Sequence, residues 1–339
     1  MIRFAFRRVL PVLLGIFLIY FVYIFVAGWR QDWVPETVVA LEASPQTGLQ
    51  GPIQDSVISL LIWNVGYGGL GASSDFFYDD EGMWYSGGSM IRSPRAAVEE
   101  NIAGAVSTLQ QNKSDILLLQ EVDVASDRSY QLPQFATYTT ALAPYTATMA
   151  YNYRCPRVPI PLLKPWNAYE NVQSRLGTFS KYQPTEATRY QLPGEYPMPD
   201  RMFQLDRCAA LHRYATRYGK DLVVINIHNS AYDPGDKIKA QQLVYLRELA
   251  VQEYAKGNFV VLGGDWNQCP PHVRFDLFMP GRSANYEQGN IPADFFPEDW
   301  VYAYDPTVPT NRKCKDVYQP NNTFVTLIDY FLEIGRAHV

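Results

Sequence analysis

Side chains that can bind a metal ion or move a proton stand directly after apolar, strand-like runs at four places in this sequence. They are Asn64, Glu121, His228, and Asp265 together with Asn267. Each pattern alone is also typical of a polar strand end that caps a neighbouring loop. Four of them together favour a different arrangement, because adjacent strand ends can meet at one edge of a sheet and line a cleft. Oxygen ligands in such a cleft suit a hard cation.

The runs that precede these residues alternate with helical patterns, which predicts a mixed α/β domain. Strands are predicted at residues 57–63, 116–119, 222–227 and 259–262. A first helix is predicted after an N-cap at Ser93, with Pro94 at its first position. Its apolar face contains Val98, Ile102, Ala105 and Leu109. A second helix begins at Asp233-Pro234 and ends at Gly257.

Two long segments and the four cysteines do not by themselves indicate a catalytic or metal site. Residues 67–93 and 156–165 are predicted as surface loops, which often shape a binding cleft. The cysteines are Cys155, Cys208, Cys269 and Cys314. They lie far apart without a C-x-x-C pair, which argues against zinc and thioredoxin-like sites. Disulfide pairing in an exported domain and four buried thiols both remain open.

The amino terminus contains an uncharged apolar run at residues 9–28, long enough to cross a hydrocarbon core of about 30 Å. Arg3, Arg7 and Arg8 precede it, so the amino end is expected in the cytoplasm and the remainder outside. The alternative is a signal peptide, whose cleavage would secrete the protein. We predict a cytoplasmic stub with a transmembrane signal-anchor at 1–30, a linker at 31–55 and a folded domain at 56–332.

Composition excludes several classes of protein. Hydrophobic residues make up 47% and charged residues 19%, as in a globular chain and unlike a disordered or fibrous one. The formal net charge of −5 argues against a broad basic face for nucleic acid. It does not argue against an enzyme that meets phosphate through a metal ion.

Five short motifs occur in order along the chain. They are IWNVG at 62–66, LQEVD at 119–123, NIH at 226–228, GGDWN at 263–267 and LIDYF at 327–331. In this order they resemble the endonuclease/exonuclease/phosphatase superfamily, which includes deoxyribonuclease I, abasic-site endonucleases, neutral sphingomyelinases and inositol-polyphosphate phosphatases. The resemblance implies a DNase I-like, four-layer α/β sandwich, in which two packed mixed β-sheets are flanked by helices.

The resemblance also implies a divalent-metal-dependent phosphohydrolase that uses Mg²⁺, with Mn²⁺ as an alternative. Glu121 is then the principal metal ligand, and Asn64 supports the metal or a phosphate oxygen. Asp265 orients or deprotonates the attacking water, and Asn267 positions the water or the phosphate. His228 stabilises developing charge or the leaving group. These roles agree with the chemistry, because a carboxylate near water can act as a base and a cation offsets phosphoryl charge.

Four further residues are weaker candidates. Arg128 is expected either to bind a substrate phosphate in a bidentate manner or to be a surface arginine. Asp123 is expected to accept hydrogen bonds in the same loop rather than to bind the metal. His212 is expected on a sheet face or in the core, and His272 in a loop.

The carboxyl end departs from the family pattern. Asp329 is expected to orient a catalytic histidine, which in the family follows a couple of dozen residues later in a Ser-Asp-His motif. Only His338 is available here, without that motif or spacing. Residues 333–339 also match the translation of a sequencing adapter and are expected to be an artefactual tail. Without the closing strand and its histidine, the chain as printed is expected to be a poor enzyme.

We therefore expect a phosphodiester hydrolase acting through metal-activated water on nucleic acid, a phospholipid head group or a small phosphodiester. One alternative is a catalytically inactive relative that binds a phosphorylated ligand or a protein. A second alternative is a phosphomonoesterase. The expected partners are the phosphate ester and a membrane that holds the N-terminal helix, with no obligate protein partner evident.

Overall fold

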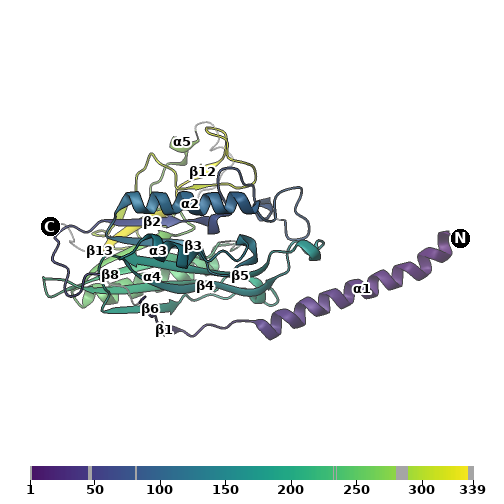
Figure 1. Cartoon of the computed structure of the whole chain (residues 1–339), viewed down its shortest axis with the longest axis horizontal. Helices are drawn as coiled ribbons and strands as arrows, with labels where there is room; N and C mark the ends of the chain where they lie inside the picture. The colour runs from purple at the N-terminus through teal and green to yellow at the C-terminus, as the bar shows by residue number, and fades with distance from the viewer. Residues whose placement is uncertain are drawn as a thin grey trace.

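The computed structural model describes residues 2–44, 48–80, 82–231, 233, 235–279 and 289–334. A long helix, α1 (Ile2–Gln31), extends away from a folded body (Figure 1). Within the described residues, the body contains a seven-stranded sheet of order β1-β6-β7-β8-β9-β13-β10, a four-stranded sheet of order β2-β3-β5-β4, and a separate β11–β12 pair.

The strands of the larger sheet are β1 (Val38–Ala40), β6 (Glu186–Gln191), β7 (Cys208–Ala215), β8 (Asp221–His228), β9 (Phe259–Asp265), β10 (Val301–Ala303) and β13 (Asp329–Ile334). Those of the smaller sheet are β2 (Leu60–Asn64), β3 (Ile116–Asp123), β4 (Thr146–Val158) and β5 (Glu170–Ser180). The separate pair is β11 (Asn311–Arg312) and β12 (Val325–Thr326). The remaining helices are α2 (Arg95–Asn112), α3 (Gln134–Ala141), α4 (Lys237–Ala255) and α5 (Phe275–Phe278), and the 3-10 turns are η1 (Gly66–Gly68), η2 (Phe77–Asp80), η3 (Asp127–Ser129), η4 (Pro165–Asn167) and η5 (Asp200–Phe203).

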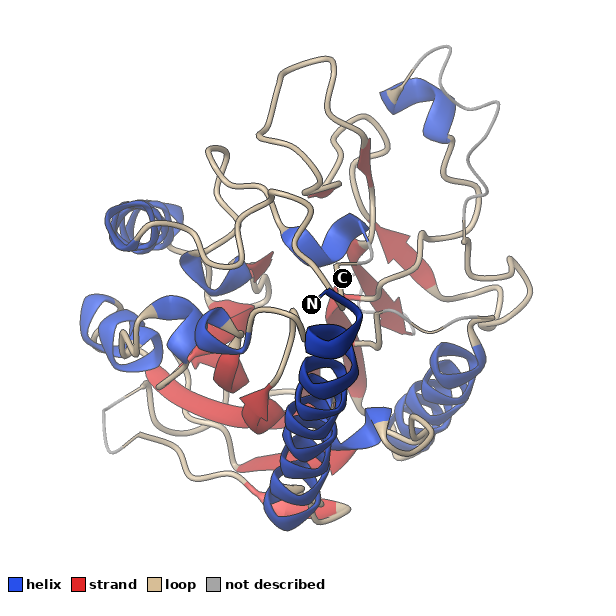
Figure 2. Cartoon of the chain, turned by 90° about the vertical axis from the view of Figure 1, so that its right-hand side faces the viewer, coloured by secondary structure: helices blue, strands red, loops and turns tan. Residues whose placement is uncertain are grey.

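The predicted four-layer sandwich is confirmed. In β3, Leu117 and Leu119 pack with α2 and α3, whereas Ile116 and Leu118 face the larger sheet. This division follows from the strand period of two, which places alternate side chains on opposite faces. The outer face of the larger sheet packs against α4. In Figure 2 helices flank the strands on both sides.

Most predicted elements are present, with differences in detail. The second helix begins at Lys237 rather than at Asp233, because Asp236 is its N-cap, and Asp233 Oδ2 accepts from the Ile238 and Lys239 backbone N–H groups. The predicted apolar face of α2 is buried as expected. The prediction of Ser93 as N-cap is wrong, because Pro94 is the N-cap residue of α2. The Ser93 hydroxyl instead forms hydrogen bonds with the Ser74 hydroxyl and the Gly69 carbonyl. The loop predicted at 156–165 begins later, because β4 continues through Val158. Within the predicted linker, β1 pairs with β6. Pro234 and His338 lie outside the described residues.

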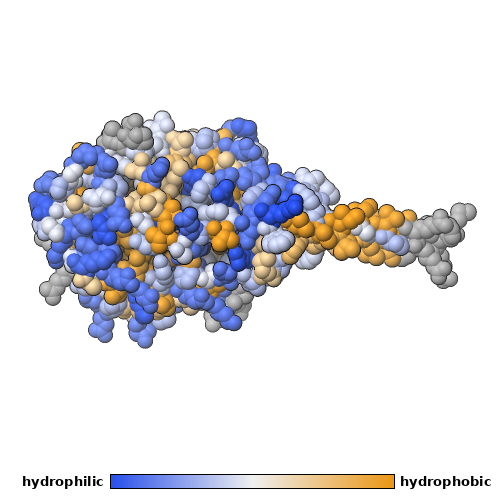
Figure 3. Space-filling view, turned by 90° about the horizontal axis from the view of Figure 1, so that it is seen from below, coloured by the Kyte–Doolittle hydropathy of each residue, from blue (hydrophilic) through white to orange (hydrophobic). Residues whose placement is uncertain are grey.

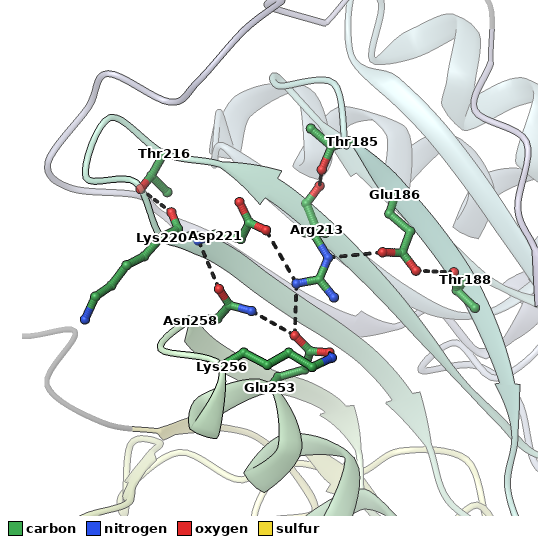
Figure 4. Close-up of polar contacts among 10 residues, drawn as sticks. All are labelled: Thr185, Glu186, Thr188, Arg213, Thr216, Lys220, Asp221, Glu253, Lys256 and Asn258. Carbon is green, nitrogen blue, oxygen red and sulfur yellow. Dashed lines mark hydrogen bonds and ion pairs between the residues drawn. The ribbon is translucent and has the colours of Figure 1, made fainter.

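A network of charged side chains stabilises one end of the larger sheet (Figure 4). The Arg213 guanidinium in β7 donates to Glu186 in β6 at 3.1 Å and to Glu253 near the end of α4 at 2.9 Å. It also lies 3.5 Å from Asp221, the first residue of β8. His228 is the last residue of that strand, so the network is structural and lies at the end opposite His228.

Strand pairing brings the predicted site residues to one end of both sheets. β8 runs parallel to β9, with His228 opposite Asp265, and β13 runs antiparallel to β9, with Asp329 opposite Asp265. In the smaller sheet β2 runs parallel to β3, so Asn64 and Glu121 reach the same end. Between the sheets, Gln120 donates to the Asn226 side chain at 2.8 Å.

A substitution of Gly264 in β9 tests the register between β8 and β9. Its φ of +145° favours glycine, and a Cβ there would fall on the Ile227 carbonyl oxygen of β8. Gly264→Ala is therefore expected to lower the free energy of unfolding by about 2–4 kcal/mol in urea denaturation. Gly104→Ala is the matched control, because Gly104 in α2 has open space around it and should gain about 0.5–1 kcal/mol. Equal stability of the two variants would contradict the pairing of β8 with β9.

Candidate active site

A cavity of about 750 Å³ opens at the strand ends. Its polar wall contains Asn64, Glu121, His228, Asp265 and Asn267, so the structure brings together the four strand-end groups that the sequence singled out. Two arginines, Arg128 and Arg207, line the same cavity.

Asn64 joins the two sheets at this wall. Its Nδ2 donates to Asp265 Oδ2 at 2.9 Å and to Glu121 Oε1 at 3.3 Å. The orientation of the amide follows from the Gly66 backbone N–H, which donates to Asn64 Oδ1 at 2.9 Å. In this arrangement Asn64 positions both carboxylates by hydrogen bonds, and its amide would have to turn over for Oδ1 to bind a metal ion.

Glu121 lies at an irregularity of β3. The pairing of β3 with β5 shifts register between Leu119 and Val122, and Glu121 has a φ of +56°. A bulge re-aims one side chain out of the strand alternation, and a non-glycine residue in this conformation is strained by about 1–2 kcal/mol. The consequence is that Glu121 is directed into the cavity while Leu119 and Val122 stay in the core beneath α2 and α3.

Asp265 and Asp329 form a crowded pair of buried carboxyl groups. Burial raises the pKa of Asp265 to about 6, against the opposing hydrogen bonds from Asn64 and the Asn267 backbone N–H, and nearby Glu121 raises it further. Burial, followed by the charges of Asp265 and Glu121, raises the pKa of Asp329 well above its ordinary value. Asp329 Oδ1 is buried without a hydrogen-bond partner. The site therefore concentrates negative charge that a cation would stabilise.

Arg207 is a site residue that the sequence patterns did not indicate. Its Nη2 lies 3.0 Å from His228 Nε2, which must accept this hydrogen bond because a guanidinium only donates. Burial, then the charges of Arg207 and Arg128, lower the pKa of His228 well below its ordinary value. The imidazole is therefore neutral with its proton on Nδ1, and that atom is buried without a partner. Arg207 comes directly before β7, and its position in the sequence does not predict the hydrogen bond to His228.

Arg128 is buried rather than a surface side chain, with 7% exposure. It makes a bidentate pair with Asp123, at 2.9 and 2.8 Å, and its guanidinium lies 3.8 Å from the centre of the Tyr67 ring. Asp123 also accepts from Ser129, as expected of a hydrogen-bond acceptor in this loop. Because the cavity reaches Arg128, its remaining donors could meet a substrate anion, and that role stays a prediction.

The remaining residues that the sequence singled out lie at several different positions in the fold. Asn267 has a φ of +51°, its backbone N–H donates to Asp265 Oδ1 at 2.9 Å, and its side chain donates to the Asn229 carbonyl. His212 is buried between the sheets beside Thr148, as predicted for a sheet-face histidine, and burial lowers its pKa to about 4. His272 is exposed in a loop. The four cysteines are buried, unpaired thiols.

The donor atoms fit Mg²⁺ better than a metal that needs many protein ligands. Among the described residues, no group of three or more His, Cys, Asp or Glu side chains is arranged to hold a metal ion. Zinc sites require three or four such ligands, whereas Mg²⁺ keeps several waters and needs only one or two carboxylates. Glu121 in the cavity wall, with Asp265 beside it and the unpartnered Asp329 Oδ1 behind, supplies oxygen for such an ion.

Comparisons with known proteins give one family match and several similar solved structures. The sequence profile described as the Endonuclease/Exonuclease/phosphatase family matches residues 61–332. Among solved structures, TDP2 from Caenorhabditis elegans is similar, with 14% identity over 82% of this chain and a TM-score of 0.48, and this chain covers 64% of its length. ANGEL2, a 2′,3′-cyclic phosphatase, is 12% identical over 89% of this chain and 88% of its own, with a TM-score of 0.45.

The catalytic domain of human Nocturnin with a bound sulfate anion is also similar. It is 14% identical over 86% of this chain and 84% of its own, with a TM-score of 0.44. A comparison with curated proteins finds no match.

Because Asp265 and Asp329 are crowded and buried, removing the charge of one of them is expected to raise the free energy of unfolding. An acid whose pKa rises on folding holds its proton more tightly in the folded chain, so stability falls as the pH rises from about 4 through the raised pKa. Asp329→Asn is expected to raise the free energy of unfolding at pH 8 by on the order of 1–2 kcal/mol, with little gain at pH 4. Urea denaturation in a chelator measures both values. Asp299→Asn, at an exposed position, is the control, and the same gain at both pH values would refute the pair's electrostatic origin.

Proposed function

The chain belongs to the endonuclease/exonuclease/phosphatase family, and from this premise we propose that it hydrolyses phosphodiesters with a divalent metal ion and water. Mg²⁺ is the proposed metal, with Mn²⁺ as a substitute. The observation that carries the proposal is the cavity wall where Asn64, Glu121 and Asp265 meet within hydrogen-bond distance. Three strands from two sheets supply these residues, and their closeness supports a base beside an oxygen ligand.

The bound metal would offset the negative charge that develops on the phosphoryl oxygens. Glu121 holds the ion, and Asn64 fixes the Glu121 and Asp265 carboxylates relative to each other. Asp265 is ionised above a pKa of about 6, so at neutral pH it can accept a proton from the attacking water. The backbone N–H of Asn267 fixes the Asp265 carboxylate through Oδ1.

His228 has a different part in the proposal. Burial, and the hydrogen bond from Arg207 to Nε2, keep the ring neutral. The unpartnered Nδ1–H is buried in this structure and would donate to a substrate oxygen once the ring turns toward the cavity. Arg207 acts through this histidine as a positioning residue. A neutral donor at this place stabilises charge on the phosphate or the leaving group without competing with the metal for electrostatic attraction.

We also propose that α1 is retained as a single membrane span with the folded domain outside the cytoplasm. The candidate span covers Val9–Gln31; its most apolar 18-residue window has a mean hydropathy of 2.7, and only 6% of that window is buried. Figure 3 shows this helix as a hydrophobic rod outside the body. A core helix would be buried, so the exposure supports a lipid environment, and the arginines before the span support the orientation.

Substitutions separate the metal ligand from the other roles. Glu121→Gln is expected to raise the Mg²⁺ dissociation constant by at least 10-fold in calorimetric titration, because it removes a charged ligand. His228→Ala should leave that constant nearly unchanged. Glu248→Gln, at an exposed position on α4, is the matched control for the charge change. Equal Mg²⁺ affinity of Glu121→Gln and Glu248→Gln would remove Glu121 from the metal site.

Turnover of bis-p-nitrophenyl phosphate completes this test. Asp265→Asn is expected to lower turnover by about 10²–10⁴-fold, the usual contribution of a positioned base, and His228→Ala should also lower it without unfolding the chain. Wild-type turnover in all of these variants would refute the site. Preference for monoesters would instead support a phosphomonoesterase, and ligand binding without turnover would support an inactive relative.

A further inference from the structure

The candidate membrane span contacts the folded domain through only part of its length. Tyr20, Ile24 and Gly28 recur every four residues and, with Phe21, face the body; Ile24 is 7% exposed. A Cβ on Gly28 would come within 2.7 Å of the Phe203 ring, so the helix backbone approaches the domain closely there. The phenol of Tyr23 lies 3.2 Å from the Arg157 guanidinium.

The free part of the span is too short to cross a bilayer alone. From Val9 to Ile19 the helix is about 16 Å long, roughly half of a 30 Å hydrocarbon core. The loops that contact residues 20–28 must therefore lie at the depth of the outer half of any bilayer that the helix crosses. In Figure 2, which looks onto this end of the body, α1 projects from among loops.

The loops at this end of the body, some of which contact the helix, expose large apolar side chains. We call this set the collar; it consists of Met83, Trp84, Tyr85, Leu163, Trp166 and Met198. The Trp84 ring lies 6.2 Å from that of Phe21, and the Leu163 backbone N–H donates to the Trp84 carbonyl. Single exposed apolar residues are ordinary, but several of them, including two tryptophans, on loops near a candidate span are typical of a membrane interface.

The same cavity that holds the carboxylates reaches the span. Besides Glu121 and Asp265, its lining includes apolar side chains of the body such as Phe77, Trp84 and Leu162. It also includes Phe21, Ile24 and Phe25 of α1 itself. A water-soluble phosphate ester has no large apolar surface to bury against a membrane helix. A phospholipid has both parts: its phosphate can contact the polar lining residues, and its acyl chains can contact the apolar ones.

We propose that the substrate is a phospholipid of the bilayer that holds α1. Its phosphate would lie at the wall of Asn64, Glu121 and Asp265, where a cation held by Glu121 would offset its charge. Its acyl chains would lie between α1 and the Trp84 and Leu162 loops. In the reaction the oxygen of water bonds to phosphorus, one ester P–O bond breaks, and the released alcohol takes up a proton. This inference rests on the proposed phosphodiesterase activity and on the retention of α1.

The first experiment locates the collar without measuring activity. The full chain is reconstituted in phosphatidylcholine vesicles that contain brominated acyl chains, and its amino end is sequenced to show that α1 is retained. Trp166 is 82% exposed, so bromine should quench its fluorescence, and Trp166→Phe should remove part of the quenched signal. Trp300→Phe is the matched control, because Trp300 is 6% exposed in the core beside α4. An unchanged quenched signal in Trp166→Phe, or loss of α1, would overturn the inference.

The second experiment measures hydrolysis with the preparation used for the soluble diester. Phosphatidylcholine, phosphatidylethanolamine and phosphatidylglycerol in vesicles are each compared with their deacylated counterparts at equal phosphate concentration. At least one lipid should be cleaved 10-fold or more faster than its deacylated form. Cleavage of bis-p-nitrophenyl phosphate without such a preference overturns the lipid substrate and leaves the proposed function intact. Cleavage of none of these compounds overturns both, even if Trp166 is quenched.

Discussion

The hydrogen bond from Asn64 Nδ2 to Asp265 Oδ2, 2.9 Å long, joins the two sheets at the end where the cavity opens. It forms only if β2 and β9 both end at this edge and both side chains point toward the cavity. Because side chains alternate along a strand, a slip of one residue in β9 would turn Asp265 to the opposite face of the sheet. The parallel pairing with β8 and the antiparallel pairing with β13 fix β9 from both sides.

The core that holds this register also supports local features that are unfavourable by themselves. Glu121 and Asn267 have positive φ angles, and Asp265 and Asp329 are buried carboxyls with raised pKa values. Strain and unpaired polar atoms of this kind persist where surrounding structure determines them, and they gather at functional sites. Here the layers beneath α2 and α4 provide that support. A cation beside Glu121 would offset the excess negative charge, so binding and stability are coupled at this site.

The sequence was sufficient for the architecture because strand and helix periods, and polar residues at strand ends, are local signals. Asn64, Glu121, His228 and Asp265 could be predicted together for that reason, and the structure places them on one wall. Arg207 and Tyr67 could not, because their approach to the cavity depends on the tertiary path of the chain before β7 and after β2. Ser93 was assigned wrongly as a helix cap because its hydroxyl bonds within the preceding loop instead. Hydropathy indicated α1, but its share in the cavity lining depends on packing against Phe203 and Trp84, which no local pattern encodes.

The central claim is that the strand ends form one cation site centred on Glu121. Anomalous scattering from crystals of the chain soaked in Mn²⁺ tests it most directly, because it locates the ion without reference to activity. The account predicts a peak within about 2.5 Å of a Glu121 carboxylate oxygen, on the side that faces Asp265. A peak elsewhere in the molecule, with none beside Glu121, would contradict it.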